Sequence, residues 1–370
     1  MLAAEIGRDL GLSPQEYERR VELAQRLAVF TATERRQSPG SVRGIWLDHA
    51  GRGVIAASDG AVRAAAKRDG FVLAEASTPG GDTATHSGRV DHLLPEIPAA
   101  ASPVAPLDPV AGGDRYMSIT EPSKHQGSEC SWAFNAVDQD GSPAALTAGH
   151  CNAAALAGAP ITEDQRSYQL LPGDKPGATT GTFEKSVVDG IRDYSIVRIA
   201  KPVRHAFHNN LVRGPVDGPA IAITGVGIPV VGAPVCKSGS TTGFTCGVIT
   251  AVDQPDPQRP PIRFKHTALS LPGDSGGALV SGSLAMGIVS DGGIYSDPSE
   301  FPTDRPGVLP PTPPGTPSLN RILHQIGPRA LEQLSPPIDG LLQFVPQVTM
   351  IAQSVADVLD ENPGLRIRTS

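Results

Sequence analysis

The sequence predicts a mainly β protein, a sandwich or a barrel, preceded by a small α/β unit. The chain of 370 residues contains 41 glycines and 36 prolines, and only 19% of its residues are charged, which favours strands joined by many turns. Between residues 110 and 290, short apolar runs alternate with glycine, as in sheets built from many short strands. Before residue 94, helical and strand patterns alternate instead.

The first segment, residues 1–93, carries signals for a helix and a small α/β unit. Ser13, Pro14 and Glu16 form a capping-box arrangement with proline at the first helical position, so we expect a helix to begin there. The other elements predicted in this segment are a hairpin of residues 44–48 and 53–58, a helix at 59–69 and a strand at 71–75.

Proline-rich stretches divide the rest of the chain. Residues 94–109 form a proline/alanine linker that is easily cut, and residues 297–317 form an extended surface loop. We predict a β domain at 110–330, including a helix at 319–326, and a C-terminal extension of unknown role at 331–370. An apolar stripe at helical spacing predicts a docked helix in that extension, in preference to a membrane anchor. The stripe comprises Val348, Ile351, Val355, Val358 and Leu359.

Charge and hydropathy exclude several classes of partner. The formal net charge of −7 gives no reason to expect binding to nucleic acid or to an anionic membrane surface. No uninterrupted apolar run is long enough to span a bilayer. We therefore predict neither a nucleic-acid partner nor a membrane span.

The four cysteines favour disulfides over a metal site. They lack the short C-x-x-C pairs of zinc sites, so two disulfides in an exported protein are the better interpretation. The first twenty residues, however, contain early acidic residues and no apolar signal core. An upstream start, another export route and an intracellular location all stay open on this observation.

Three motifs supply residues suited to nucleophilic catalysis. Serine needs a base within hydrogen-bond reach, itself oriented by a third group. Ser275 lies in PGDSGG, His150 ends an apolar strand in TAGHC, and Asp193 heads an alternating strand in DYSIVR. Each has an ordinary explanation, as a turn residue or a packed histidine, and Asp189 competes with Asp193 although its Asp-Gly pair resembles a hairpin turn. The order His, Asp, Ser matches a triad arrangement built on paired β-barrels.

Together with CKSGSTTGFTCG at 236–247, these motifs resemble the chymotrypsin-fold bacterial serine endopeptidases of the streptogrisin and α-lytic protease type. The resemblance covers roughly residues 110–330. It implies two six-stranded antiparallel β-barrels and a secreted, self-processing endopeptidase that acts through an acyl-enzyme without a metal or other cofactor. Its partners would be polypeptide substrates and its own pro-region, and its location would be extracellular or the cell envelope.

The resemblance also implies a role for each residue. Ser275 would be the nucleophile, His150 the general base and then acid, and Asp193 the ionised group that holds the imidazole tautomer. The backbone N–H groups of Gly273 and Ser275 would form the oxyanion hole. Ser290 would support Asp193.

An ion pair and two disulfides follow from the same resemblance. Asp274 should be buried and needs a cation, and Lys237 stands where the relatives carry arginine. We expect replacement of Lys237 by alanine to weaken activity more than folding. A third bridge common in the group is missing, because Leu269 stands at the position of its first cysteine. The implied disulfides are Cys130–Cys151 and Cys236–Cys246.

Two segments should line the pocket for the residue before the cut. No acidic residue stands at its base, so medium or large apolar side chains are the expected preference. Asp291 is unusual in that wall; it either favours basic groups at a neighbouring subsite or, the stronger expectation, faces solvent. The expected pocket residues are Leu269, Ser270, Leu271, Pro272, Ser290, Asp291 and Gly292.

Residues 1–93 resemble the pro-region of these proteases, a folding assistant and inhibitor that is later removed. Self-cleavage in the 94–109 linker, near Leu107, would suit an enzyme that prefers apolar residues. Two alternatives to this function are a protease-fold binding protein that has lost catalysis and an intracellular serine protease.

Overall fold

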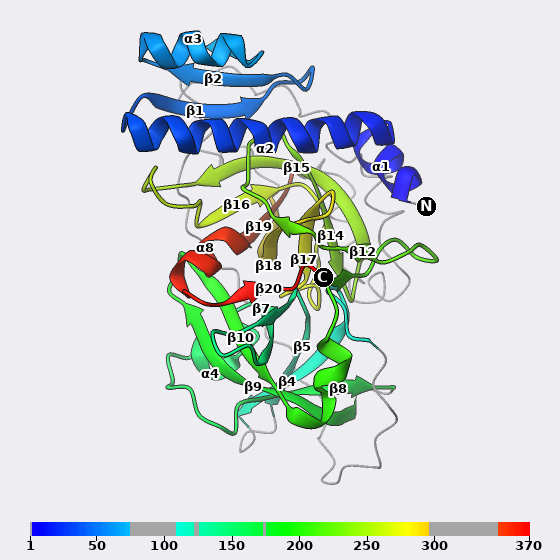
Figure 1. Cartoon of the computed structure of the whole chain (residues 1–370). Helices are drawn as coiled ribbons and strands as arrows, with labels where there is room; N and C mark the ends of the chain where they lie inside the picture. The colour runs from blue at the N-terminus through cyan, green and yellow to red at the C-terminus, as the bar shows by residue number, and fades with distance from the viewer. Residues whose placement is uncertain (1, 75–108, 122–125, 173–174, 296–346) are drawn as a thin grey trace.

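The structure, a computed structural model, consists of an α/β unit and two β subdomains (Figure 1). We call residues 2–74 the N-terminal unit. The predicted mainly β architecture is confirmed for the other residues that the structure describes. The structure describes residues 2–74, 109–121, 126–172, 175–295 and 347–370.

The N-terminal unit packs helices against a small sheet. Ser13 caps the second helix, because its hydroxyl accepts a hydrogen bond from the backbone N–H of Glu16 at 3.2 Å. The first two strands form an antiparallel hairpin, and the third pairs with the second in parallel. These elements agree with the sequence-based expectations, except that α1 was not anticipated. They are α1 (Leu2–Leu10), α2 (Pro14–Gln37), β1 (Val42–Leu47), β2 (Gly53–Ala57), α3 (Gly60–Arg68) and β3 (Val72–Ala74).

The first β subdomain is an antiparallel sheet in the order β20-β6-β7-β10-β9-β8-β4-β5. Its core includes Trp132, which stacks on Tyr116 at 4.0 Å between ring centroids and meets Phe207 edge-on. The elements of this subdomain are β4 (Arg115–Glu121), β5 (Gln126–Ser131), β6 (Asn135–Val137), β7 (Pro143–Thr147), α4 (Ala153–Leu156), β8 (Arg166–Leu171), β9 (Lys175–Val188), β10 (Asp193–Ile199), η2 (Lys201–Phe207) and β20 (Arg366–Ile367).

The second β subdomain is a closed barrel, which we call the second barrel. Its strands follow the order β18-β17-β14-β15-β16-β19, and pairing of β18 with β19 closes the ring. The short strand β13 (Gly225–Val226) adds to β18 in parallel. The barrel strands are β14 (Pro234–Gly239), β15 (Gly243–Asp253), β16 (Arg263–His266), β17 (Ala278–Ser281), β18 (Leu284–Tyr295) and β19 (Gln347–Ser354). The strands β11 (Leu211–Val212) and β12 (Ile221–Ala222) form a separate hairpin.

The C-terminal residues correct the domain boundary predicted at residue 330. Residues 347–370 are not a separate extension, because β19 completes the second barrel and β20 pairs with β6 of the first β subdomain. The predicted apolar helix is also partly wrong. Its first half is strand β19, and only the second half is helix α8 (Val355–Glu361). A strand whose two faces are both buried can carry apolar residues at the same positions as a helical stripe. The helix predicted at 319–326 and the loop at 297–317 lie outside the described residues.

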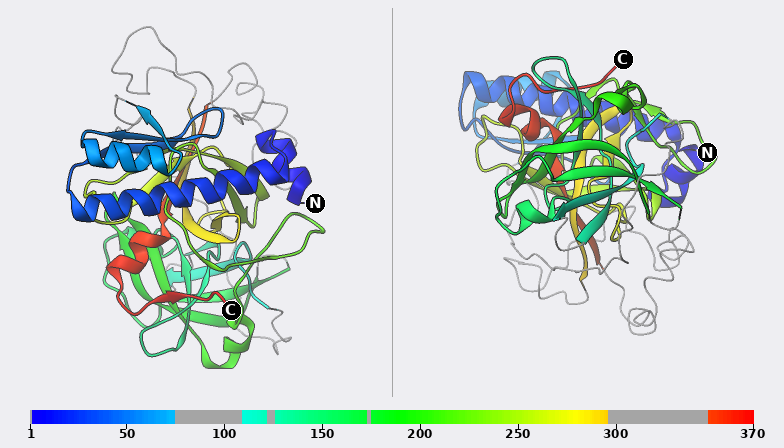
Figure 2. Two further views of the ribbon diagram at one scale, coloured as in Figure 1. Left: turned by 45° about the horizontal axis from the view of Figure 1, so that its top comes forward. Right: turned by 90° about the horizontal axis from the view of Figure 1, so that it is seen from below.

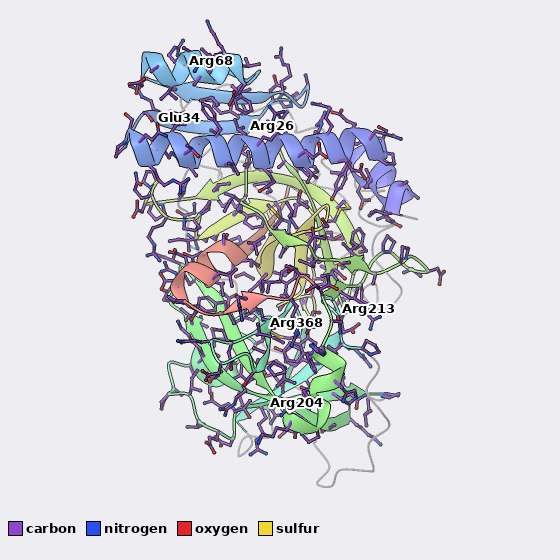
Figure 3. All side chains as sticks on the ribbon, viewed as in Figure 1. Arg26, Glu34, Arg68, Arg204, Arg213 and Arg368 are labelled. Atoms are coloured by element: carbon purple, nitrogen blue, oxygen red, sulfur yellow. A yellow bond between two sulfur atoms is a disulfide. The ribbon has the colours of Figure 1, made fainter. Side chains whose placement is uncertain are left out.

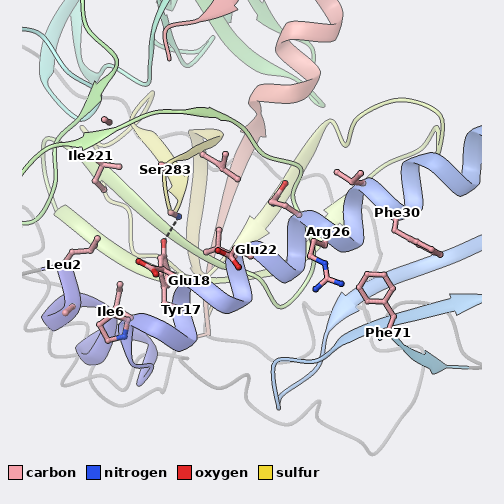
Figure 4. Close-up of a pocket in the computed structure, with 18 of the residues that line it drawn as sticks. Leu2, Ile6, Tyr17, Glu18, Glu22, Arg26, Phe30, Phe71, Ile221 and Ser283 are labelled. Carbon is pink, nitrogen blue, oxygen red and sulfur yellow. Dashed lines mark hydrogen bonds between the residues drawn. The ribbon is translucent and has the colours of Figure 1, made fainter. Parts of the chain in front are cut away.

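Two buried polar side chains of the N-terminal unit bind the backbone of the second barrel. The Asp9 carboxylate, 1% exposed, accepts a hydrogen bond from the N–H of Cys246 at 2.8 Å. The Tyr17 hydroxyl accepts one from the N–H of Gly282 at 2.9 Å (Figure 4). These contacts satisfy barrel backbone groups that would otherwise need water.

The rest of the interface runs along α2 and the β1–β2 hairpin, with α2 lying between the hairpin and the second barrel (Figures 1 and 2). Gln25 bonds both the N–H and the carbonyl of Ile228, at 2.9 and 3.1 Å. The N–H of Leu47 donates to the carbonyl of Val231 at 2.8 Å. One buried apolar cluster includes Leu27 of α2 together with residues of the barrel. The N-terminal unit and the barrel therefore share a core.

A mostly apolar groove of about 1560 Å³ runs along α2 (Figure 4). The residues that line it include Ile6, Val21, Phe30, Phe71 and Ile221. None of the expected site residues lines this groove. The candidate active site therefore lies elsewhere.

Arg213 anchors the start of the first β subdomain (Figure 3). It donates to both carboxylate oxygens of Asp114, at 2.7 and 2.8 Å, and to the carbonyl of Pro109 at 2.8 Å.

Among the residues that the structure describes, no helix has the length and apolar character needed to cross a membrane.

Candidate active site

His150 and Asp193 meet at one end of the first β subdomain. His150 follows β7, and its ring Nδ1 lies 2.7 Å from Oδ2 of Asp193. Its backbone N–H donates to Oδ1 of the same carboxylate at 2.8 Å. The carboxylate thus binds both the ring and the main chain of His150. This arrangement fixes the ring and favours the tautomer with a proton on Nδ1.

Gly149 makes this close approach possible. A Cβ atom at Gly149 would lie 2.1 Å from the carbonyl oxygen of Val187 and 2.9 Å from Oδ1 of Asp193. Any larger residue would therefore push the His150 turn away from β9 and β10. The small residue before His150 in TAGHC is thus required by packing.

Asp193 stands at the first position of β10 and receives a further hydrogen bond from the second barrel. The Ser290 hydroxyl, on β18, donates to its Oδ2 at 2.6 Å. Burial acts to raise the pKa of Asp193, but the charge and hydrogen bonds of His150 and the Ser290 hydroxyl outweigh it, so the pKa lies below its ordinary value. The competitor Asp189 accepts bonds from the N–H groups of Ile191 and Arg192, which makes it a turn residue.

Ser275 lies in the loop before β17, against the strand that leads to His150. Its carbonyl accepts a hydrogen bond from the N–H of Ser131 at 2.8 Å. A Cβ atom on the next residue, Gly276, would lie 2.1 Å from Oγ1 of Thr147, at the end of β7. The Ser275 backbone is therefore packed on the segment that carries His150. The site lies at the junction of the first β subdomain and the second barrel.

The loop around Gly273 is shaped by two serines that sequence reasoning missed. Gly273 has φ +97°, a conformation that favours glycine, and a Cβ there would lie 2.3 Å from Oγ1 of Thr241. Its carbonyl accepts hydrogen bonds from the hydroxyls of Ser131 and Ser240, at 2.7 and 2.9 Å. Holding this carbonyl fixes the peptide plane between Gly273 and Asp274. Ser240 belongs to the CKSGSTTG motif, and this motif could have identified it as a site residue from the sequence.

Lys237 and Asp274 form a fully buried ion pair. Nζ of Lys237 lies 3.1 Å from Oδ2 of Asp274, and both side chains are 0% exposed. Asp274 also accepts hydrogen bonds from the N–H groups of Thr241 and Leu271, both at 2.9 Å, and from Thr242. Burial lowers the pKa of Lys237, and the Asp274 charge opposes that shift.

Complete burial of this pair adds an expectation about stability. We expect Lys237→Met to lower the free energy of unfolding by about 3 kcal/mol, because it leaves a buried carboxylate without its cation. The fraction of active sites should fall too, since Asp274 holds the loop next to Ser275. Urea unfolding and active-site titration measure the two effects, with exposed Lys175→Met as the control. Equal stability of the Lys237 and Lys175 variants would contradict a stabilising pair.

The structure contains both disulfides implied by the resemblance. Cys130–Cys151 joins β5 to the residue after His150, with 6.3 Å between the Cα atoms. Cys236–Cys246 links two directly paired residues of β14 and β15, with 4.0 Å between the Cα atoms. Among the described residues, no group of three or more histidine, cysteine, aspartate or glutamate side chains is arranged to hold a metal ion.

The expected pocket segments lie beside β19, which sequence reasoning did not connect with them. Leu269 is fully buried and Ser270 is 9% exposed, Leu271 is half-buried, and Pro272 is exposed. In the sheet register, Asp291 and Gly292 on β18 pair with Ile351 and Met350 on β19. The C-terminal strand therefore lies next to the predicted substrate wall.

His266, at the end of β16, is a buried histidine outside the predicted site. It is 0% exposed, and neither ring nitrogen has a hydrogen-bond partner among the described residues. Burial, with a smaller effect of the Lys237 charge, lowers its pKa to about 3. His266 is therefore neutral in the folded protein at ordinary pH.

We expect His266 to make the fold acid-sensitive. The imidazole has its ordinary pKa of 6.5 in the unfolded chain, whereas its pKa in the folded chain is about 3. Since the unfolded state binds more protons between these values, the free energy of unfolding falls as pH falls from 6.5 towards 3. His266→Leu should flatten this dependence by up to about 1.4 kcal/mol per pH unit. Urea unfolding across this pH range measures the slope, and an unchanged slope would disprove the assignment.

Comparison with known proteins places this geometry in a family. No protein-family model matches the chain. The chain is 33% identical to streptogrisin-D of Streptomyces griseus over 207 residues, which cover 53% of this chain and 44% of that protein. It is 32% identical to serine protease 2 of Streptomyces fradiae over 191 residues, which cover 50% of this chain and 94% of that protein.

The chain thus spans less than half the length of streptogrisin-D and nearly all of serine protease 2. Among solved structures, it resembles Nocardiopsis protease (NAPase), with 24% identity, a TM-score of 0.43, and coverage of 70% of this chain and 99% of that one. From the extensive match to serine protease 2, we conclude that the chain belongs to the streptogrisin-type family of bacterial chymotrypsin-fold serine proteases.

Proposed function

We propose that the chain is a serine-type endopeptidase that cleaves peptide bonds through an acyl-enzyme on Ser275. The observation that carries this proposal is the Asp193 carboxylate, which binds both the ring and the backbone of His150 next to the Ser275 loop. A turn serine, a packed histidine and a turn aspartate would have no reason to converge in this way. The convergence favours an active enzyme over a binding protein that has lost catalysis.

The proposed reaction begins when Oγ of Ser275 attacks the substrate carbonyl carbon and His150 accepts the hydroxyl proton at Nε2. The tetrahedral oxyanion is stabilised by the N–H groups of Gly273 and Ser275. Collapse breaks the C–N bond, and His150 returns its proton to the leaving amine. Water then attacks the acyl carbon while His150 accepts a proton from it; collapse breaks the bond to Oγ of Ser275, His150 returns the proton to Oγ, and the acid is released. Asp193 stays ionised throughout and stabilises the imidazolium.

We further propose that the enzyme prefers medium or large apolar residues before the cut. The fully buried Leu269 supports this preference, because it offers no charge at the expected pocket base. The other expected pocket residues add no charge there, because Ser270, Leu271, Pro272 and Ser290 are all uncharged, and Asp291 is expected to face solvent. A pocket base without a counter-charge disfavours charged side chains, because their desolvation is costly.

Export and self-processing belong to the same proposal. The two disulfides support an oxidising location outside the cytoplasm. The N-terminal unit would act as a pro-region, and its shared core with the second barrel supports a role in assembling that barrel. Cleavage in the 94–109 linker would then separate the two. N-terminal sequencing of matured protein tests this, and a start before residue 90 would contradict it.

Hydrolysis of a peptide p-nitroanilide series tests the proposed function. The series carries phenylalanine, leucine, arginine or glutamate before the cut and is otherwise identical. We expect kcat/KM to be highest for the two apolar residues, and every activity to vanish in the presence of a serine-directed phosphonate. Turnover of the arginine or glutamate substrate as the best of the series would overturn the preference alone. No turnover of any member by matured protein would overturn the enzyme proposal.

A further inference from the structure

A buried glutamine of the C-terminal strand contacts the backbone of the candidate catalytic aspartate. Gln353, on β19, is 1% exposed. Its side-chain Oε1 accepts a hydrogen bond from the N–H of Asp193 at 3.0 Å. The two residues lie 160 positions apart in the chain, and they belong to different β subdomains. The glutamine therefore connects the second barrel directly to the first residue of β10.

The other end of the Gln353 amide is held as firmly. Its Nε2 donates to the carbonyl of Ile262 at 2.9 Å and to Oδ2 of Asp357 at 3.0 Å. Asp357, itself 1% exposed, accepts a further bond from Nε of Arg192 at 3.1 Å. Arg192 directly precedes Asp193. The Gln353–Asp357 pair thus binds this dipeptide at two points. Gln353 binds the backbone of Asp193, and Asp357 binds the side chain of Arg192.

The same strand supports the carboxylate of Asp193 from another side. Ser290, which donates to Oδ2 of Asp193, lies on β18 between residues that pair with Ala352 and Ile351 of β19. One strand therefore contacts the Asp193 main chain through Gln353 and adjoins the residue that binds its carboxylate. A shift of Asp193 by a fraction of an ångström would alter its geometry with His150.

We propose that Gln353 is a positioning residue for the triad, which sets the orientation of the Asp193 carboxylate towards His150 by holding the Asp193 N–H. This inference rests on the proposed function. It assigns the C-terminal segment of the chain a part in catalysis. The side chain acts through Asp193 and does not touch the substrate.

Gln353→Met tests the inference, since methionine fills a similar volume without hydrogen-bonding groups. We expect kcat per titrated active site to fall about 10- to 100-fold, with KM nearly unchanged, because the acid–base geometry is displaced and the pocket is not. Active-site titration removes any loss caused by misfolded protein. The matched control is Ser354→Ala, because the adjacent Ser354 hydroxyl is buried and no described residue forms a hydrogen bond with it. Its kcat should equal that of the wild type.

A double-mutant cycle shows whether Gln353 acts through Asp193. In an Asp193→Asn background, we expect Gln353→Met to cause little further loss, because the carboxylate that it positions is already gone. Full additivity of the two changes, or an unchanged kcat per active site in the single variant, would overturn the inference. Gln353→Leu replaces Gln353→Met if the latter yields no folded enzyme. An inactive wild type would instead overturn the proposed function.

Discussion

Replacing Ser275 with alanine lowers kcat by about 10⁶-fold towards a peptide substrate, if Ser275 is the nucleophile. The hydroxyl oxygen is the atom that forms the acyl bond, and alanine has no group to take its place. KM should change little, because the pocket segments and the oxyanion N–H groups stay in position. Steady-state hydrolysis by purified protein measures both constants. The alanine variant must be matured in trans if self-processing is required.

Ser283→Ala is the matched control for this variant. Ser283 lies on the turn between β17 and β18, and its hydroxyl bonds only Thr224 among the described residues. Its loss should leave kcat within about twofold of the wild type, as for surface substitutions generally. Residual activity of the Ser275 variant above about one percent of the wild type would refute a serine nucleophile at this position.

Asp193→Asn should lower kcat by about 10⁴-fold while the fold is retained. An asparagine amide can turn its NH₂ group towards Nδ1 of His150, which then becomes an acceptor. The proton moves to Nε2, so the ring loses the lone pair that receives the Ser275 proton. Because the pKa of Asp193 lies below its ordinary value, the wild-type carboxylate stays ionised when pH falls moderately below neutral. The loss should therefore be seen across that range.

The neighbouring turn residue provides the control for this change. Asp189→Asn keeps the oxygen that accepts bonds from Ile191 and Arg192, so we expect normal kcat. Circular dichroism and urea unfolding check that both variants are folded. Equal activity of the Asp193 and Asp189 variants would contradict the assignment of Asp193 to the triad.

Sequence reasoning could locate the candidate site because its key residues lie in short local motifs. TAGHC needs a glycine so that His150 can approach Asp193, and PGDSGG needs glycines to turn the Ser275 loop. Such backbone requirements involve only a few neighbouring residues, so they produce short motifs that can be recognised in the sequence. Ser13 and the helix that it caps were predictable for the same reason.

Contacts between distant segments could not be predicted in this way. Gln353 carries no motif, and its importance depends on β19 entering the second barrel beside Ser290. The predicted β domain ended at residue 330, although β19 later completes the second barrel. An apolar stripe also fits both a helix and a buried strand, which explains the error at residues 347–354.

The docking of the N-terminal unit was likewise hidden from the sequence. No sequence motif marks Asp9 or Tyr17, yet each is buried and binds the backbone of the second barrel. Asp9 contacts Cys246 and Tyr17 contacts Cys236, so both contact the hairpin that carries the Cys236–Cys246 disulfide. Tyr17 also binds Gly282, on the turn between β17 and β18. The role of these two polar groups depends on the barrel backbone that they bind, which the sequence alone does not place beside them.

Covalent labelling shows whether Ser275 is an activated nucleophile. Matured protein is treated with a fluorophosphonate and digested, and the modified peptide is identified by mass spectrometry. We predict one adduct per chain, on Ser275, which disappears in Ser275→Ala and is strongly slowed in Asp193→Asn. No adduct on the matured wild type, or an adduct on another serine that persists in Ser275→Ala, would show that Ser275 is not the activated nucleophile.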